Sequence, residues 1–391
     1  MIFRVAEELA DGMTLARPVM NPGRPQDDLL KAGYTLTGRS IAALRRFRVR
    51  GAWVVDESFG FIDAMYPAGL DLARREAIAQ VKSSFEALER HPERDVDLAP
   101  FDRAAGILLD AVASERPAFA HFESFASHEN FLYVHSANVC TFAVMLGRAL
   151  TGYLTAQRGR PDASGGSGLK DLALGAILHD IGNIRLSPDL RYRPDDLSPQ
   201  ELAQAREHVR LGYDMLRLSA SPLVAQVALN HHQRWDGRGY PERRDHKTGE
   251  VRPPLAGESI PVFCRFLAPP DVFDTAVGER FFSEGKSPAR ALHEMRRSVN
   301  RGWFDPTVEQ AFYGLAPPMP PGTSVRLSTG ETAVVVSFNP SAPGRPKVAA
   351  VTDADGRAVE GASRLEIDLA VSRDLSVTHW LDQDVAAYVE D

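Results

Sequence analysis

The feature that most constrains this chain is a series of imidazole and carboxylate side chains between Tyr133 and Arg280. The series consists of His135, the pair His179-Asp180, His208, the pair His231-His232, and Asp271, and it includes five of the eleven histidines. Neutral imidazole and carboxylate are the main nitrogen and oxygen ligands of iron, manganese, zinc and nickel in proteins. A helical bundle can collect such residues because side chains from several helices project into its core. The series therefore predicts a helical core that holds two metal ions.

The position of the His179-Asp180 pair supports this interpretation. The pair follows the apolar run Leu172–Leu178 directly. Polar residues seldom follow such a run unless they are paired or bound to a metal. Any one of these histidines could be a hydrogen-bonded core residue. Two ions, however, need six to ten ligands between them, and a bridging carboxylate helps to hold them together.

The residues on either side of the series divide the chain into three parts. Residues 1–60 contain short runs typical of strands, Phe3–Val5, Thr14–Ala16 and Ala52–Val55, and one expected helix over Gly38–Phe47. Residues 57–68 have the composition of a linker. Residues 69–316 are predicted to be helical, and Pro317–Pro321 marks a boundary. Beyond it, residues 324–336 alternate and turn like a hairpin, and residues 347–352 resemble a further strand. We expect a mainly α protein with a small β-rich module before the bundle and a small β extension over 317–391.

Several helices of the central part can be read from their apolar spacing. Residues 70–88, 101–113 and 131–150 carry apolar side chains three and four residues apart. Ser198 and Pro199, with Glu201 three residues after the serine, are typical of a helix start. We expect the helix that begins there to continue through Leu216, with Ala205, Val209, Gly212 and Leu216 on one stripe.

Composition limits the classes of function. No run of 18 apolar residues predicts a membrane-spanning helix, and the first residues lack the pattern of a signal peptide. The two cysteines, Cys140 and Cys264, lie in apolar runs and are expected to be buried free thiols, which fits a reducing cytoplasm. The net charge of −7 does not favour binding of DNA. The oligomeric state stays open.

The residues after the second histidine pair add a distinctive loop. Residues 231–241 read His-His-Gln-Arg-Trp-Asp-Gly-Arg-Gly-Tyr-Pro. With Tyr133-x-His135, His179-Asp180-Ile181-Gly182, His208-x-x-x-Gly212 and Asp271-Val-Phe-Asp274, this loop resembles the motifs of the HD-GYP family, bacterial phosphodiesterases of cyclic di-GMP. The resemblance covers about residues 129–316, and the flanking parts also resemble modules that accompany this domain.

The resemblance implies a function and a set of site residues. It implies hydrolysis of cyclic di-GMP to pGpG, and possibly on to GMP, by a hydroxide between two ions, with iron or manganese favoured over zinc or nickel. The implied metal ligands are His135, His179, Asp180, His208, His231, His232 and Asp271, with Asp180 as the bridge. The implied catalytic and substrate-binding residues further include Asn183, Arg280, Asp236, Gly239, Tyr240 and Pro241. The Gly239-Tyr240-Pro241 loop is also a surface on which partner signalling proteins could dock.

Three positions depart from the family pattern. The lysine usual after His-Asp-x-Gly is Asn183, which brings no charge to a phosphate and could instead end a helix. Phe131 stands where some members have an acid that supports a third metal, so two ions are expected. The Arg-x-Tyr motif that is usual in the family is here Arg280-Phe281-Phe282, which lacks the tyrosine hydroxyl. Arg185 or Arg191 could supply the lost charge. Trp235 could stack on guanine or pack beneath the loop.

Two alternatives to this phosphodiesterase remain open. One is a module that binds cyclic di-GMP or partner proteins with slow or no turnover, because lysine is replaced by Asn183. The other is hydrolysis of a different phosphate ester, such as another cyclic dinucleotide or a nucleotide monophosphate.

Overall fold

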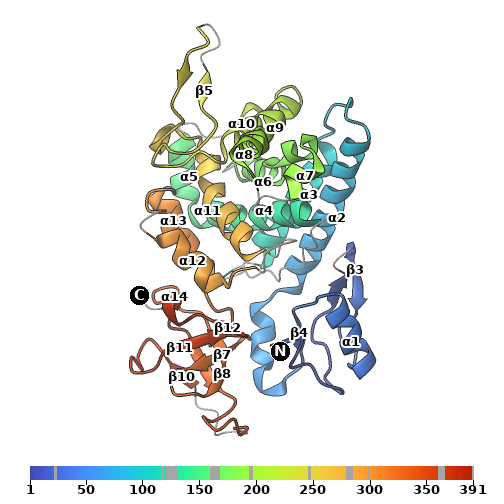
Figure 1. Ribbon diagram of the computed structural model, residues 1–391, viewed down its shortest axis with the longest axis vertical. Coiled ribbons are helices and arrows are strands. Elements are labelled where there is room, and N and C mark those ends of the chain that lie inside the picture. Colours follow the sequence, from blue (N-terminus) through green and yellow to red (C-terminus); the bar gives the residue numbers. More distant parts are fainter. Residues whose placement is uncertain are drawn as a thin grey trace.

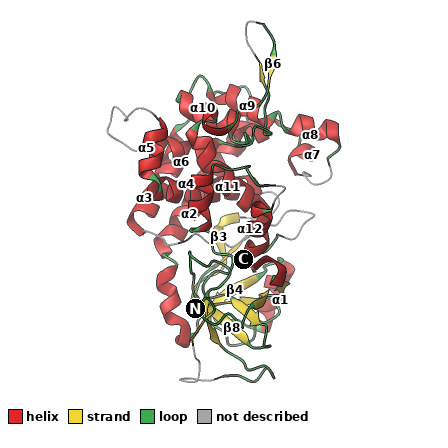
Figure 2. Cartoon of the chain, turned by 90° about the vertical axis from the view of Figure 1, so that its left-hand side faces the viewer, coloured by secondary structure: helices red, strands yellow, loops and turns green. Residues whose placement is uncertain are grey.

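The protein is mainly helical, with a helical bundle at one end and two small β-rich segments side by side at the other (Figures 1 and 2). The computed structural model describes residues 1–21, 24–115, 119, 130–158, 168–192, 197–244, 248–278, 285–297, 300–359 and 366–389. The fold class expected from the sequence is confirmed.

The N-terminal segment consists of short strands, one helix and a 3-10 helix. Its elements are β1 (Ile2–Val5), β2 (Val19–Asn21), β3 (Arg24–Leu30), α1 (Gly38–Arg46), β4 (Gly51–Val54) and η1 (Glu57–Met65). Strand β1 pairs antiparallel with β4, and β2 pairs with β3. Thr37 caps α1 through a reciprocal pair of hydrogen bonds with Ser40. The strands predicted at 3–5 and 52–55 and the helix predicted at 38–47 are therefore present, whereas residues 14–16 form only isolated bridges.

The central bundle begins with a long helix and is built around a nearly buried one. Its elements are α2 (Ala68–Arg90), α3 (Ala99–Glu115), α4 (Phe131–Ala149), α5 (Thr151–Arg158), α6 (Leu169–Leu178), η3 (Ile181–Arg185), α7 (Pro188–Tyr192), α8 (Pro199–Ala205), α9 (His208–Leu216), α10 (Pro222–Asn230), β5 (Arg243–Arg244), β6 (Val251–Arg252), η5 (Gly257–Ser259), α11 (Val262–Val277), α12 (Pro288–Arg296) and α13 (Pro306–Tyr313). Helix α4 packs against α2, α3, α6 and α11, and its residues 132–147 are all buried. The paired strands β5 and β6 project from the far end of the bundle (Figures 1 and 2).

The helix predicted from Ser198 is shorter than expected. Ser198 and Glu201 form the predicted capping box, but α8 ends at Ala205 and α9 starts at His208. The residues predicted for one stripe, Val209, Gly212 and Leu216, are buried on α9, whereas Ala205 belongs to α8. The break allows His208 to lie at the first position of a helix, where it faces the bundle core.

The C-terminal segment is one antiparallel sheet with a short final helix. Its elements are β7 (Ser324–Leu327), β8 (Thr332–Ser337), β9 (Lys347–Ala350), β10 (Glu366–Asp368), β11 (Val377–Trp380), β12 (Gln383–Asp384) and α14 (Ala386–Val389). The strand order is β10-β9-β8-β7-β11-β12. The hairpin predicted at 324–336 is the β7–β8 pair, in which Ser324 lies opposite Val334.

This sheet is buried on both faces, and one face completes the core of the N-terminal segment. Side chains alternate between the faces of a strand. Val334 and Val336 of β8 therefore join the cluster that contains Trp53, whereas Val335 joins a cluster on the opposite face with Ala289 of α12. Backbone and side-chain hydrogen bonds also link the two segments, from Phe3 N to Gly322 O and from the Tyr66 hydroxyl to Pro321 O.

The linker predicted at 57–68 is incorrect. Residues 57–65 form η1, and its Phe59 and Ile62 are 2% and 0% exposed in the core that the two β-rich segments share. The composition of this stretch is typical of a loop, but its two apolar side chains find partners far along the chain.

Two expectations about the rest of the chain concern thiols and membranes. Cys140 and Cys264 are buried and free, and burial raises the pKa of both thiols. In the described part of the chain, no single helix has the length and hydropathy needed to cross a bilayer; α4 and α5 meet that test only together, and they are bent by 89° at their junction.

The shared core makes the stability of the N-terminal segment depend on the C-terminal sheet. We expect Val334→Ala to cost about 2 kcal/mol of unfolding free energy, because it removes two buried methyl groups. Amide hydrogen exchange should become faster in β1 and β4 as well as in β8. The control is Val371→Ala, because Val371 is 78% exposed. Faster exchange confined to the C-terminal sheet would contradict the shared core.

Candidate metal centre

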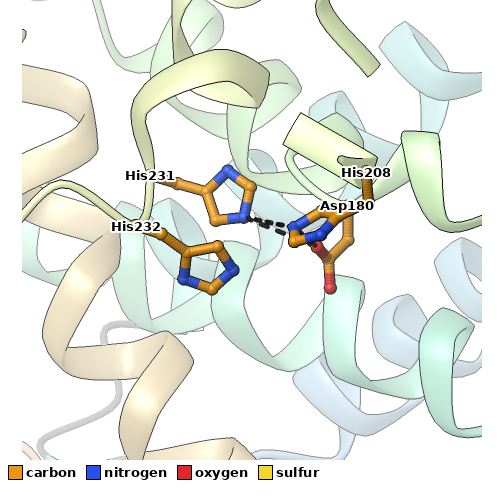
Figure 3. A group of neighbouring side chains, drawn as sticks. All are labelled: Asp180, His208, His231 and His232. Carbon is orange, nitrogen blue, oxygen red and sulfur yellow. Dashed lines mark hydrogen bonds and ion pairs between the residues drawn. The ribbon is translucent and has the colours of Figure 1, made fainter. Parts of the chain in front are cut away.

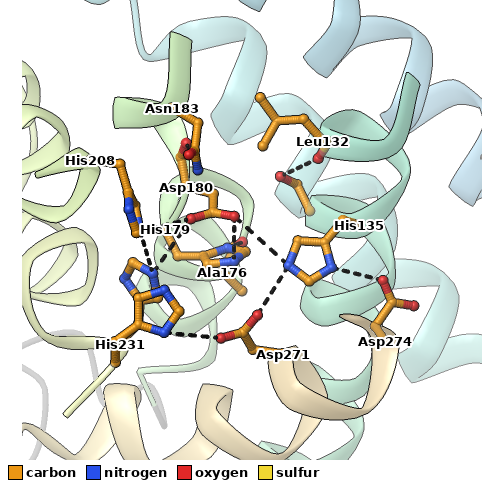
Figure 4. A network of polar contacts seen from close by, with 12 residues as sticks. Leu132, His135, Ala176, His179, Asp180, Asn183, His208, His231, Asp271 and Asp274 are labelled. Carbon is orange, nitrogen blue, oxygen red and sulfur yellow. Dashed lines mark hydrogen bonds and ion pairs between the residues drawn. The ribbon is translucent and has the colours of Figure 1, made fainter. Parts of the chain in front are cut away.

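The seven residues of the predicted series meet at one place in the bundle, although they come from five helices or their ends. His135 lies on α4, His179 is the C-cap residue of α6, and Asp180 follows it. His208 opens α9, His231 is the C-cap residue of α10 with His232 after it, and Asp271 lies on α11. Figures 3 and 4 show these side chains pointing toward one another. The structure thus confirms that the series converges.

Asp180 lies at the centre of the cluster, between two groups of nitrogen atoms. Its Oδ1 is 3.3 Å from His208 Nε2 and 3.5 Å from His231 Nε2. Its Oδ2 is 3.6 Å from His179 Nε2 and 3.9 Å from His135 Nε2. The two groups that could each hold a metal ion are Asp180 with His208, His231 and His232, and Asp180 with His135 and His179. Asp180 is common to both.

Asp271 is the second carboxylate that faces both groups. Its Oδ1 lies 3.2 Å from His135 Nε2, and its Oδ2 lies 3.6 Å from His232 Nδ1. The centre is also enclosed, because His135, His179, His208, His231 and Asp271 are each at most 6% exposed. Two buried carboxylates surrounded by imidazoles are a charge arrangement that a cation stabilises.

Hydrogen bonds from the outer ring nitrogens to backbone carbonyls orient three of the histidines. The Nδ1 atoms of His179 and His208 each donate to a backbone carbonyl at 2.8 Å, those of Ala176 and Ala205. His231 Nδ1 contacts the carbonyls of Val227 and Ala228, both at 3.1 Å. A carbonyl oxygen can only accept, so the proton lies on Nδ1 and the Nε2 lone pair is free to face the centre. His179 Nε2 is buried and has no hydrogen-bond partner among the described residues. A buried nitrogen in this state is suited to a metal ion.

The charges of the centre follow from its burial. Burial lowers the pKa of His179 to about 4 and also lowers those of His208 and His232, so these rings are neutral at pH 7. Burial alone would raise the pKa values of Asp180 and Asp271, but the surrounding imidazoles hold both below the ordinary value. Both carboxylates are therefore ionised.

When no cation is present, the neighbouring carboxylates favour the doubly protonated, charged form of two imidazoles. Burial opposes the charged form of His135, but hydrogen bonds to Asp271 and Asp274 raise its pKa to about 10. Asp180 likewise raises the pKa of His231 against the effect of burial. These protons lie where a cation would be bound, and metal binding displaces such protons.

Two further buried residues support His135, and the sequence had given them no role. Asp274 Oδ2 accepts from His135 Nδ1 at 2.8 Å, and Asn138 Nδ2 donates to Asp274 Oδ1 at 2.8 Å. A carboxylate behind a ligating histidine fixes the ring and increases its basicity. Spacing was the available signal, since Asp274 follows Asp271 by three residues and Asn138 follows His135 by three, one helical turn in each case.

A glycine contact fixes the distance between the His-Asp pair and His208. A Cβ atom at Gly182 would lie 1.9 Å from the carbonyl oxygen of His208 and 2.5 Å from the backbone nitrogen of Gly212. Only glycine lets η3 approach α9 this closely. The His208-x-x-x-Gly212 motif is therefore part of the centre, because both of its ends lie at this close contact.

The loop after the second histidine pair folds back over His232. Tyr240 N donates to His232 O at 3.1 Å, and the buried Gln233 donates through Nε2 to Pro241 O at 2.8 Å. A Cβ atom at Gly239 would lie 2.4 Å from His232 O, so a side chain is excluded there. The Tyr240 ring stacks on His232, with ring centroids 4.6 Å apart.

The centre is least buried on the side of this loop. His232 and Asp180 are partly exposed, with 27% and 16% of their side-chain surface accessible. The exposed Arg206, between α8 and α9, lies with its guanidinium carbon 4.9 Å from the centre of the Tyr240 ring. The sequence gave no signal for Arg206. Its charge lies beside the exposed edge, where an anion would approach.

The other predicted site residues have different outcomes. Asn183 lies inside η3 rather than at a helix end, and its Nδ2 donates to Asp180 O at 3.1 Å. Asp236 accepts from Arg234 and from the backbone nitrogen of Arg238 within its own loop. Arg280, with Phe281 and Phe282, lies outside the described residues.

Arg185 and Arg191, which could have supplied the charge of the missing lysine, are engaged elsewhere. Arg185 donates to Pro92 O at 2.7 Å, and Arg191 pairs with Glu89 and donates to Asn183 O at 2.9 Å.

Phe131 stacks on the His135 ring, with ring centroids 5.3 Å apart, so an apolar ring occupies the position of the acid that could support a further metal. Trp235 is partly buried, and the guanidinium carbon of Arg265 lies 5.8 Å from the centre of its ring.

Comparisons with known proteins agree with these features. Residues 148–308 match the family described as HD domain, and residues 324–387 match the KOW domain associated with HD domain. Cyclic di-GMP phosphodiesterase PA4108 of Pseudomonas aeruginosa is 31% identical over 210 residues, which cover 53% of this chain and 45% of that protein. A cyclic di-GMP phosphodiesterase of Thermotoga maritima is 32% identical over 148 residues, 37% of each chain.

The name of a third relative gives a different substrate. It is 3'3'-cGAMP-specific phosphodiesterase 2 of Vibrio cholerae, 30% identical over 135 residues, which cover 34% of this chain and 24% of that protein. The chain thus spans less than half the length of each of these three relatives.

Because a side chain at residue 182 would collide with the backbone at His208, we expect Gly182→Ala to disrupt the centre. The variant should lose about 1–3 kcal/mol of stability and bind Mn²⁺ at least tenfold more weakly. The control is Gly106→Ala on α3, where a Cβ atom meets nothing within 4 Å, and which should be as stable as the parent or more so. Thermal unfolding and Mn²⁺ titration give the two values. Equal Mn²⁺ affinity in both variants would contradict the assigned role of Gly182.

Proposed function

We propose that this chain, whose residues 148–308 match the HD domain family and whose motifs resemble those of HD-GYP proteins, is a metal-dependent phosphodiesterase that hydrolyses cyclic di-GMP to pGpG. The observation that carries the proposal is the set of inward-facing Nε2 atoms around Asp180 and Asp271. The substrate is supported by the names of the relatives, several of which are cyclic di-GMP phosphodiesterases.

The proposed centre holds two divalent ions, with His135, His179, His208, His231, His232, Asp180 and Asp271 as ligands. Asp180 belongs to both candidate groups, which supports its role as the bridge. Mixed imidazole and carboxylate ligation favours iron or manganese. When bound, such ions activate water for attack on phosphorus and neutralise the charge that develops on the phosphoryl oxygens.

The protein's own side chains would position the substrate and exclude water. Tyr240, stacked on His232, forms one wall beside the exposed edge of the centre, and Gly239 and Pro241 set the course of that loop. Arg206 would meet a phosphate there and could supply the charge that Asn183 lacks. Arg280 remains a proposed phosphate contact on the strength of the family motif alone. The same loop is a proposed docking surface for partner signalling proteins.

The experiment that tests this proposal combines metal analysis with product identification. Protein purified without oxygen and loaded with Fe²⁺ or Mn²⁺ should hold two ions per chain and convert cyclic di-GMP to pGpG. His179→Ala should lose bound metal and at least 100-fold in turnover, because a ligand is removed. The control is His91→Ala, since the His91 side chain is exposed and pairs with Glu93.

The alternatives give other results in the same experiment. Metal-loaded protein that binds cyclic di-GMP without forming product would identify a binding module. Faster cleavage of 3'3'-cGAMP than of cyclic di-GMP would identify a different cyclic dinucleotide as substrate. Absence of bound metal under these conditions would contradict the proposal itself.

The replacement of lysine at position 183 predicts a gain-of-function variant. We expect Asn183→Lys to raise kcat for cyclic di-GMP about tenfold, equal to about 1.4 kcal/mol, because an ammonium forms a charge-assisted contact with phosphate. Asn183→Met is the control, since a methionine side chain is similar in length to lysine but carries no charge. Initial rates at saturating substrate give kcat. Equal rates in the parent and the lysine variant would mean that another cation, such as Arg206, already fills this role.

A further inference from the structure

The proposed metal ligands are held in place by two different means. His179, His208 and His231 each direct Nδ1 at the backbone carbonyl of a residue three or four positions earlier. His135 instead directs Nδ1 at the carboxylate of Asp274, at 2.8 Å (Figure 4). The backbone fixes a carbonyl near a helix end, whereas a side-chain carboxylate must itself be held by further contacts. His135 belongs to only one of the two candidate groups of ligands, so the two groups differ in what supports them.

The contact that holds Asp274 leads through Asn138 to an arginine on α2. Asn138 Nδ2 donates to Asp274 Oδ1 at 2.8 Å, and Asn138 Oδ1 accepts from Arg74 Nη2 at 2.6 Å. A guanidinium group has only donors, whereas an amide has an acceptor oxygen and a donor NH₂ group. Arg74 therefore turns the oxygen of Asn138 toward α2 and its NH₂ group toward Asp274. Asp274 Oδ2 then accepts from His135 Nδ1, and the Nε2 atom of that ring faces the centre.

The series Arg74–Asn138–Asp274–His135, here called the relay, is buried along its length. Each of its four side chains is at most 6% exposed, and they come from α2, α4 and α11. A buried hydrogen-bonding group that loses its partner either stays unsatisfied, at a cost, or turns to another partner. The loss of an early member of the relay is therefore expected to disturb the orientation of the last one.

From these contacts we propose that Arg74 and Asn138 are positioning residues for one of the two metal ions, the one that His135 would bind. The ion of the other group does not depend on them, because backbone carbonyls orient His208 and His231. This inference rests on the proposed two-metal centre. Arg74 lies in the second turn of α2, so the end of that helix next to the N-terminal segment sets the occupancy of half of the centre.

The number and affinity of bound ions test the inference on the full, metal-free chain titrated with Mn²⁺. The parent should bind two ions. Asn138→Leu and Arg74→Met should each weaken one of the two sites about tenfold or more, because the support of a ligating histidine is lost, and should change the other less than threefold. At two equivalents of Mn²⁺, electron paramagnetic resonance should show a coupled pair in the parent and isolated ions in both variants.

Two matched variants separate the relay from the mere loss of a buried or charged group. Thr141→Val removes a buried hydroxyl that donates to Ala137 O on the same helix as Asn138. Arg75→Met repeats the arginine substitution one residue further along α2, where the side chain binds Asp28. Both controls should bind two ions with affinities within threefold of the parent's. A control that loses one ion as the relay variants do would overturn the assignment.

A double variant tests whether Arg74 acts through Asn138. Because both residues belong to one series of hydrogen bonds, the double variant of Arg74→Met and Asn138→Leu should bind Mn²⁺ no more weakly than Asn138→Leu alone. Losses that add would mean that Arg74 acts through other contacts, and they would overturn the relay. The ion that stays bound shows that each variant is folded, and Arg74→Met decides alone if Asn138→Leu does not fold.

The orientation of His135 also has a signature that needs no metal. A proton held between a buried ring nitrogen and a carboxylate gives a downfield ¹H NMR signal, which is assigned here by its absence from His135→Gln protein. Arg74→Met and Asn138→Leu should shift or broaden this signal in the metal-free protein, whereas Thr141→Val should leave it in place. A signal that is unchanged in both relay variants would overturn the positioning role.

The inference and the proposed function fail in different ways. If the parent binds two ions and forms pGpG, but the relay variants lose both ions equally or neither, the inference fails and the phosphodiesterase stands. If the parent binds no Mn²⁺, the proposed function fails, and the inference that rests on it fails too.

Discussion

The hydrogen bonds on the outer nitrogens of the histidines are the constraint on which the rest of the centre depends. His179, His208 and His231 each direct Nδ1 at a carbonyl of the preceding helical turn, so the backbone of α6 to α10 decides which nitrogen faces inward. These three histidines lie at helix ends, where carbonyls and irregular backbone are available. A bound metal ion would need those lone pairs, and the helix ends set their direction. The backbone at these helix ends thus fixes the direction of the imidazole rings.

The two β-rich segments form a second unit that is built from both ends of the chain. Val334 and Val336 of the C-terminal sheet pack with Trp53 and Phe59 of the N-terminal segment, and Val335 on the opposite face packs toward α12. The sheet therefore connects the N-terminal segment to the bundle on one side, while α2 connects it on the other.

Much of the centre could be predicted because its signals are local. Adjacent His-Asp and His-His pairs, a glycine after His-Asp, and the Gly-Tyr-Pro loop can each be read from a few neighbouring residues. The main helices followed from apolar spacing, and the β7–β8 hairpin from its alternation. Residues whose role comes from a distant partner were not found, as with Asn138 and Asp274, which contact one another across 136 positions. Phe59 and Ile62 were read as linker residues for the same reason, because their partners lie in strands far along the chain.

The shared core of the two β-rich segments has a consequence for the order of folding. During synthesis the first strands emerge from the ribosome long before β8 does. Their apolar side chains therefore lack their partners in β8 until the whole bundle has been synthesised. The bundle can assemble first from its own contacts, and the N-terminal segment closes last, when the final sheet arrives. Until then its early strands expose apolar surface and unpaired edges, which favour aggregation of the nascent polypeptide.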